Sequence, residues 1–198
     1  MYPISKLPVV ILSSKRTGST VLAIEMLDQL RSVHGDVGFY NEPMESRSED
    51  QMRGLMQAID RDEPFVLKVH AYDVVREYPN TVKDLITSGD VFLVRIRRRN
   101  IVEQIASHYL ASRRNTWQYH GNEQIGEESM VPIDMERLDR SIRYINHYNM
   151  TLDGYPASFD LDLCYEDLSF LGRIYAKTPK PDDYHVLTDA VRDRLGSI

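Results

Sequence analysis

The sequence predicts an α/β protein in which a parallel sheet of about five strands is flanked by helices. Strand-like runs alternate with amphipathic helical patterns along the chain, and such alternation is typical of a parallel sheet covered by helices on both faces. Two of the expected strands lead into short basic turns followed at once by a helix. We expect one domain, residues 1–198, because no repeat or linker divides the chain. The alternation does not specify the strand order.

The first half of the chain contains three expected strands and two expected helices. Residues 9–12 are apolar and mostly β-branched, and the helical pattern at residues 19–31 places its leucines and a methionine on one side. A short strand is expected at residues 37–40. At residues 48–59 the apolar side chains recur at helical spacing, and the run at residues 65–69 is apolar enough for a buried strand.

The second half continues the alternation. A small helix is expected at residues 81–87 and a buried strand at residues 91–96, and a helix at residues 101–112 follows that strand directly. The longest amphipathic pattern covers residues 134–152. Residues 159–163 alternate between apolar and acidic side chains, which favours a strand with one exposed face.

The most informative motif is the turn after the first strand, which reads Arg16, Thr17, Gly18, Ser19 and Thr20. A strand, a tight turn and a helix together aim backbone N–H groups and a helix N-terminus at an anion. The arginine adds a permanent charge and a planar set of donors. The turn therefore predicts a phosphate ligand, although an ordinary strand-to-helix turn is the alternative. It is not the usual nucleoside triphosphate loop, which has a lysine directly after its second glycine.

A second basic motif follows the strand at residues 91–96. It reads Arg97, Arg98, Arg99 and Asn100, and Ser107 lies eight positions after Arg99 on the following helix. Arginines at a helix start, with a hydroxyl farther along, can hold another phosphate. The alternative is a solvated basic loop. We favour the phosphate site because ligands of α/β sheets bind at this end of the strands.

These residues resemble the sulfotransferases that use 3'-phosphoadenosine 5'-phosphosulfate (PAPS). The turn at residues 16–20 is similar to the family's 5'-phosphosulfate loop, and Arg99, Asn100 and Ser107 match its 3'-phosphate motif in type and spacing. Lys68-Val69-His70 looks like the K-x-H of the cytosolic members. Tyr165-Glu166-Asp167-Leu168 looks like the family's Y-E-D-L, whose tyrosine lies near the adenine. The matches keep the family's order and span residues 9–168.

The resemblance implies a P-loop-like sulfotransferase fold, closest to the compact bacterial or phage-type members. Two departures stand against it. Ile101 replaces the proline that often follows R-N in the second motif, and nothing like the late R-K-G loop of the cytosolic members appears at residues 172–198. The third contact to the 3'-phosphate is therefore open, and Arg97 or Arg98 can supply it.

Two residues compete for the role of general base. His70 matches the catalytic histidine of the cytosolic members, and a neutral imidazole can accept a proton near pH 7. Glu42, in Tyr40-Asn41-Glu42-Pro43, resembles the acidic base of bacterial and carbohydrate-type members. We favour Glu42 slightly because the chain resembles the compact bacterial members. Alternatively, His70 is a satisfied strand-end histidine and Glu42 a solvated turn carboxylate.

The resemblance implies that a sulfuryl group passes from PAPS to a hydroxyl or amine acceptor, a carbohydrate or another small molecule, by in-line displacement. Adenosine 3',5'-bisphosphate would be the product, and no metal is required. Arg16 would stabilise the leaving phosphate, Lys68 would reach the sulfuryl oxygens, and Tyr165 would contact the adenine. The segment at residues 112–121 is a candidate for the acceptor site and residues 121–131 for a lid. Acceptor identity and oligomeric state are not specified.

Two other functions stay open. A nucleotide or small-molecule kinase with a degenerate phosphate loop would need Mg²⁺ and a carboxylate after a core strand, for which Asp90 and Asp162 are poor candidates. A non-catalytic adenosine-bisphosphate-binding module would use Arg16, Arg99 and Ser107 without needing Glu42 or His70.

Composition restricts the partners. The net charge of -6 argues against bulk nucleic-acid binding. The single cysteine, Cys164, excludes an internal disulfide and fits a reducing compartment. No apolar run approaches the length of a membrane span and no signal peptide is recognised, so we expect a cytoplasmic protein.

A last helical pattern lies at residues 187–195 and completes the expected order of strands and helices.

Overall fold

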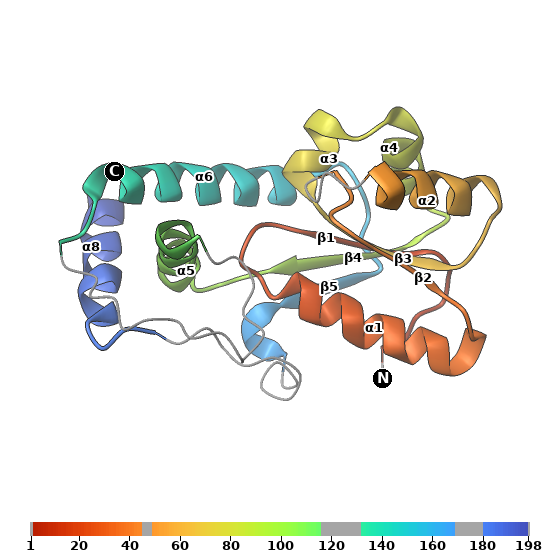
Figure 1. The fold of residues 1–198 in the computed structure, drawn as a ribbon, viewed down its shortest axis with the longest axis horizontal. Coiled ribbons are helices and arrows are strands. Elements are labelled where there is room, and N and C mark those ends of the chain that lie inside the picture. The colour runs from red at the N-terminus through yellow and green to blue at the C-terminus, as the bar shows by residue number, and fades with distance from the viewer. Residues whose placement is uncertain (1, 45–48, 116–131, 169–179, 198) are drawn as a thin grey trace.

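The sheet has five strands, and all of them are parallel. The structure is a computed structural model that describes residues 2–44, 49–115, 132–168 and 180–197. The strand order is β2-β3-β1-β4-β5 (Figure 1). The strands are β1 (Val9–Ser13), β2 (Gly38–Asn41), β3 (Phe65–His70), β4 (Phe92–Arg97) and β5 (Leu161–Cys164). The predicted fold class, an α/β protein with a parallel sheet of about five strands flanked by helices, is confirmed.

Each helix expected from the sequence is present, within a few residues of its expected bounds. The helices are α1 (Ser19–His34), α2 (Glu49–Asp60), α3 (Ala71–Glu77), α4 (Asn80–Thr87), α5 (Ile101–Arg114), α6 (Met135–Asp153) and α8 (Tyr184–Gly196), and Tyr165–Asp167 forms a 3-10 turn. The sequence did not predict α3. It follows β3 without a break and has two adjacent valines, so its short pattern shows no clear helical period.

The two faces of the sheet are covered by different helices, as Figure 1 shows. Alternate residues of each strand point to opposite faces. On one face, Val9 and Ile11 pack with α1 through side chains such as Leu22 and Met26. On the other face, Val10 and Leu12 belong to a cluster that includes residues of α2, α3, α4 and the end of α6. The sheet is therefore the middle of three layers, and strand β1 is buried on both faces.

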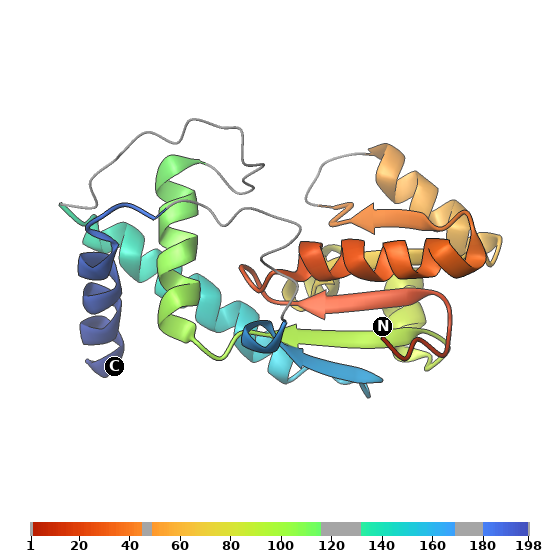
Figure 2. The same cartoon turned by 90° about the horizontal axis from the view of Figure 1, so that it is seen from below.

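A separate helical unit lies beyond the carboxyl ends of the strands. Helices α5, α6 and α8 pack on one another around Ile105, Tyr109, Ile142 and Leu187, and Figure 2 shows them past the arrowheads of the sheet. Because this unit faces the strand ends, the loops leaving the sheet are enclosed between two packed bodies. Among the helices of the described ranges, none is long and apolar enough to cross a membrane.

Successive strands are added to one side of β1 first and then to its other side. From β1 the chain runs outward to β2, returns to β3 beside β1, and then crosses to β4 on the other side of β1. Open α/β sheets bind ligands in the crevice that forms at the carboxyl ends of such strands. The residues after β1 are therefore where a ligand is expected on topological grounds alone.

Candidate functional site

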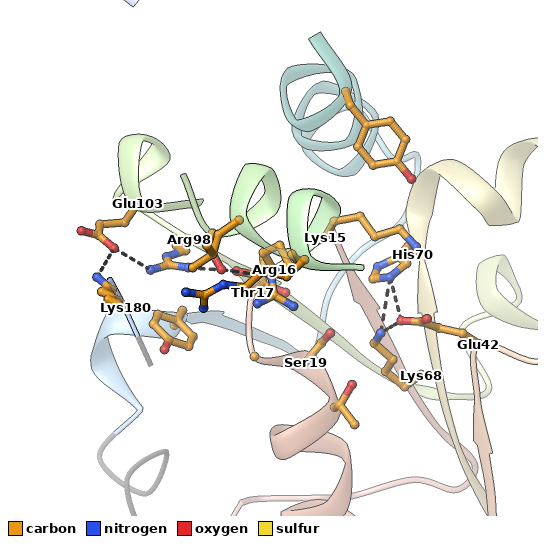
Figure 3. Close-up of a pocket in the computed structure, with 18 of the residues that line it drawn as sticks. Lys15, Arg16, Thr17, Ser19, Glu42, Lys68, His70, Arg98, Glu103 and Lys180 are labelled. Carbon is orange, nitrogen blue, oxygen red and sulfur yellow. Dashed lines mark hydrogen bonds and ion pairs between the residues drawn. The ribbon is translucent and has the colours of Figure 1, made fainter. Parts of the chain in front are cut away.

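A cavity of about 650 Å³ opens at the carboxyl ends of the strands (Figure 3). Residues at or after the ends of all five strands line it, and helices α5, α6 and α8 contribute the opposite wall. Its lining residues are Lys15, Arg16, Thr17, Gly18, Ser19, Thr20, Glu42, Lys68, His70, Arg98, Glu103, Ser107, Leu110, Ala111, Arg114, Tyr144, Tyr165, Lys180 and Tyr184. Ten of the eleven site residues expected from the sequence are in this list; the exception is Arg99.

The loop between β1 and α1 is shaped by unusual backbone angles and by buried hydrogen bonds. Gly18 precedes α1 with φ +71°, and Arg16 also has a positive φ, of +62°. The Thr17 hydroxyl donates to the Ser14 carbonyl at 3.0 Å. From α5, Gln104 Nε2 donates to the Ser14 hydroxyl at 2.8 Å and to the Lys15 carbonyl at 2.6 Å. The loop is thus held at the N-terminus of α1, whose dipole favours an anion.

Arg16 joins the two motifs that the sequence singled out. Its Nε donates to the Ser107 hydroxyl at 3.0 Å, although the two residues are 91 positions apart. The carbonyl of Arg16 accepts a hydrogen bond from Arg98 Nη1 at 3.2 Å. Burial lowers the pKa of Arg16, but an arginine keeps its charge in proteins. A fixed positive charge therefore lies between the β1 loop and helix α5.

Arg98, and not Arg99, faces the cavity. The guanidinium carbon of Arg98 lies 4.6 Å from the centre of the Tyr165 ring, and 13% of the side chain is exposed. The Arg99 side chain is 59% exposed and pairs with Asp167 at the surface. The Glu166 carboxylate accepts from the backbone N–H of Arg99 at 3.0 Å, which fixes the loop in this orientation. The sequence left Arg98 as one option for a phosphate contact.

Asn100 has a structural role at the same loop. Its side chain accepts a hydrogen bond from the backbone N–H of Glu103 at 3.1 Å and so caps the start of α5. The second carboxylate oxygen of Glu166 accepts from the backbone N–H of Asn100 at 3.0 Å. These contacts position helix α5, and with it Ser107, relative to the sheet.

The wall beside Arg98 contains residues that no motif of the sequence singled out. Lys180 donates to Glu103 at 2.7 Å and lies 4.2 Å from the centre of the Tyr184 ring. The Tyr184 hydroxyl donates to the same carboxylate at 3.3 Å. Lys180 and Tyr184 belong to no recognised motif; the packing of α8 against α5 brings Tyr184 here, and Lys180 contacts α5 through Glu103.

At the other end of the cavity, Glu42, Lys68 and His70 form one cluster. Glu42 Oε1 contacts the Lys68 ammonium and lies 2.7 Å from His70 Nε2 (Figure 3). The backbone of Glu42 has φ +48°, and its N–H donates to the Lys68 carbonyl at 2.8 Å. A non-glycine residue in this conformation is held there by its surroundings. The β2–β3 register therefore aims the Glu42 carboxylate into the cavity.

Burial governs the ionisation of this cluster. It lowers the pKa of His70 well below the ordinary histidine value, and the charges of Lys68 and Lys15 lower it further. The Asp73 carboxylate acts in the opposite direction, and the net shift in pKa favours the neutral imidazole at pH 7. Burial also lowers the pKa of Lys68, whereas the contact with the Glu42 carboxylate acts in the opposite direction.

Lys15 is a further cation on this side of the cavity, and it points away from Arg16 and toward His70 (Figure 3). Its ammonium lies 3.9 Å from the buried Asp73 carboxylate and 5.5 Å from the centre of the Tyr148 ring. The Tyr148 hydroxyl donates to Asp73 at 2.6 Å. Burial lowers the pKa of Lys15 to about 8. A lysine beside the motif is visible in the sequence, but its partners from α3 and α6 are not.

Parts of the sequence-based hypothesis lie outside the described residues. These are the candidate lid, and the candidate acceptor segment beyond residue 115. Asp162, considered for a kinase, pairs with Arg95 and Arg97 and does not line the cavity. Within the described ranges, no group of three or more histidine, cysteine or acidic side chains is arranged to hold a metal ion.

Comparisons with known proteins do not add to this picture. No protein-family model matches the chain, and no curated protein matches it.

Proposed function

We propose that the protein is a PAPS-dependent sulfotransferase. The observation that carries the proposal is that one cavity collects the β1–α1 loop, the Arg16–Ser107 pair and the carboxylate of Glu42. The first two features suit a ligand with phosphate groups, and the third suits proton removal from an acceptor. These features come from the sequence motifs that resemble the sulfotransferase family.

The charge of the cavity supports a highly anionic ligand. Its described lining holds six cationic side chains, Lys15, Arg16, Lys68, Arg98, Arg114 and Lys180, and two carboxylates, Glu42 and Glu103. PAPS carries roughly four negative charges near neutral pH. The chain as a whole has a net charge of -6, so the positive charge is concentrated at this site.

The proposed chemistry requires positioning and charge stabilisation more than covalent catalysis. The acceptor oxygen or nitrogen forms a bond to sulfur while the bond from sulfur to the 5'-phosphate oxygen breaks, and the electron pair of that bond leaves with the phosphate. Arg16 and the N-terminus of α1 stabilise the leaving phosphate. The proton of the acceptor goes to Glu42, and Lys68 neutralises charge on the sulfuryl oxygens.

Recognition of the 3'-phosphate differs in one respect from the sequence-based hypothesis. Arg98 lines the cavity with Ser107, whereas Arg99 pairs with Asp167 outside it. We therefore propose Arg98 as the arginine that binds the 3'-phosphate, with Lys180 as a second cation in place of the absent R-K-G loop. Tyr165, stacked with Arg98, lies where it can contact the adenine.

Ligand-induced stabilisation tests this function. Adenosine 3',5'-bisphosphate should raise the free energy of unfolding without any metal, by about 2.7 kcal/mol at one hundred times its dissociation constant. Thermal unfolding is compared with ATP and GTP, each with and without Mg²⁺. Stabilisation by ATP that depends on Mg²⁺, with none by the bisphosphate, would support a kinase and refute the proposal. Radiolabelled sulfuryl transfer from PAPS to a panel of sugars and phenols then distinguishes an enzyme from a binding module.

A further inference from the structure

Ser13 connects the phosphate loop to the candidate base through buried hydrogen bonds. Ser13 is the last residue of β1 and pairs in register with His70, the last residue of β3. Both side chains are almost completely buried. The Ser13 hydroxyl lies 2.9 Å from His70 Nδ1 and 3.1 Å from the hydroxyl of Ser19, the first residue of α1.

The positions of the protons follow from what each atom can donate. Because His70 is neutral, one ring nitrogen carries hydrogen and the other accepts. His70 Nε2 lies 2.7 Å from Glu42 Oε1, and a carboxylate oxygen only accepts. Nε2 also lies 3.4 Å from the Lys68 ammonium, but that ammonium is closer to Glu42 Oε1. Nε2 therefore carries the hydrogen and donates it to Glu42. The opposite tautomer would place two lone pairs face to face at that distance.

This tautomer determines the rest of the chain of hydrogen bonds. Since Nδ1 of His70 has a lone pair, the Ser13 hydroxyl donates its single proton there. The longer alternative, the Val69 carbonyl at 3.4 Å, is not used. The Ser13 oxygen then accepts from Ser19. The order is Ser19 to Ser13 to His70 to Glu42, with every donor facing an acceptor.

We propose, on the basis of the proposed function, that Ser13 is a positioning residue that holds the His70 ring against Glu42 and so links ligand binding at the phosphate loop to Glu42. Its donation occupies the only lone pair of the imidazole, so His70 orients Glu42 and does not accept the substrate proton. Ser19 lines the cavity. An anion bound there accepts the hydrogen bond that Ser19 otherwise donates to Ser13. Hydrogen bonds in a chain polarise one another, so occupancy of the loop changes the hydrogen bonds at His70.

Nitrogen-15 NMR of the histidine side chains tests the first part directly in the wild-type chain. The His70 ring should be neutral at pH 7, with hydrogen on Nε2 and a hydrogen-bonded lone pair on Nδ1. The signals are assigned by their loss in His70→Asn. A ring with hydrogen on Nδ1 would overturn the proposal, whatever the variants do.

Two variants test the role of the Ser13 hydroxyl, and a third serves as their control. Ser13→Ala should remove the hydrogen bond at His70 Nδ1 and shift the signal of that nitrogen, and Ser13→Thr should restore the wild-type signal. Ser14→Ala is the matched control, because Ser14 is equally buried and bonds Gln104 instead of His70. Unchanged His70 signals in Ser13→Ala would refute the positioning role.

Ligand addition tests the link to the phosphate loop. Adenosine 3',5'-bisphosphate should shift the His70 Nδ1 signal in the wild type, and Ser19→Ala, at a ligand concentration raised to saturation, should lack that shift. A ligand that binds the wild type, by thermal stabilisation, and leaves His70 unchanged would overturn the link. Failure of the bisphosphate to bind would instead refute the proposed function, and the tautomer result would still stand.

Discussion

The guanidinium of Arg98 stacks on the Tyr165 ring, with 4.6 Å between the guanidinium carbon and the ring centre. Arg98 follows β4 and Tyr165 follows β5, so the pairing of these two strands brings them together. The stack limits the motion of the arginine, and its Nη1 is further held by the Arg16 carbonyl. A guanidinium held in this way is prepared for a phosphate.

We expect Arg98→Ala to weaken binding of adenosine 3',5'-bisphosphate by about 1.5–3 kcal/mol, because it removes charge-assisted hydrogen bonds to one phosphate. Binding of adenosine 5'-phosphate should change much less. Isothermal titration of both ligands measures the difference. Arg99→Ala is the matched control, since its side chain pairs with Asp167 outside the cavity. A larger loss in Arg99→Ala would show that the side chains rearrange on binding and would return the role to Arg99.

The arginines also show what the sequence could and could not predict. The spacing of apolar residues was enough to locate every strand and six helices of the described ranges. Burial of one face of a strand or helix requires apolar residues to recur at a fixed spacing. The choice between Arg98 and Arg99 depends on how Glu166 holds the backbone of the loop. Neither that contact nor the strand order appears in a local pattern.

The candidate base cluster was predicted in its members but not in its geometry. Glu42 follows β2 and His70 ends β3, and both were predicted as possible bases. The register of β2 on β3 and of β3 on β1 places His70 between Glu42 and Ser13. Lys180 and Tyr184 could not be predicted, because they reach the cavity only through the packing of α8 on α5.

Glu42→Gln should leave affinity for adenosine 3',5'-bisphosphate nearly unchanged and lower turnover roughly 10²–10⁴-fold with an identified acceptor. The amide keeps the shape of the side chain but cannot take the acceptor proton. Turnover is measured as sulfuryl transfer from PAPS at saturating substrates. His70→Asn should cost less, since the imidazole acts through the position of Glu42. The reverse order of effects would assign the base to His70.

Gly18→Ala should lower the free energy of unfolding by about 1–2 kcal/mol, because φ is +71° at this position and a Cβ is unfavourable there. It should also abolish stabilisation by adenosine 3',5'-bisphosphate, since the turn presents the N-terminus of α1. Gly89→Ala is the control: φ is +84°, no atom lies within 4 Å of the added Cβ, and the residue is far along the chain from the loop. It should lose stability and keep the ligand response. Loss of the response in both variants would attribute the effect to general destabilisation.

The last prediction concerns pH. Burial lowers the pKa of Lys15 to about 8, so the ammonium is charged below that pH and neutral above it. The groups that face it include Asp73, Tyr148, Lys68 and His70. An anion in the cavity binds the charged form, and its affinity should therefore fall as pH rises from 7 to 9.5.

The same shift makes a separate prediction for stability. An unfolded lysine keeps its proton to about pH 10.4, so between pH 8 and that value the unfolded chain binds more protons at this site. The contribution of Lys15 to the free energy of unfolding should therefore rise over the interval in which ligand affinity falls.

The variant Lys15→Arg, which stays charged, tests the effect on ligand affinity. Titration of adenosine 3',5'-bisphosphate in this variant should show a shallower dependence on pH than in the wild type. Equal slopes in the two proteins would exclude Lys15 as the titrating group, and Lys68 would be the next residue to replace.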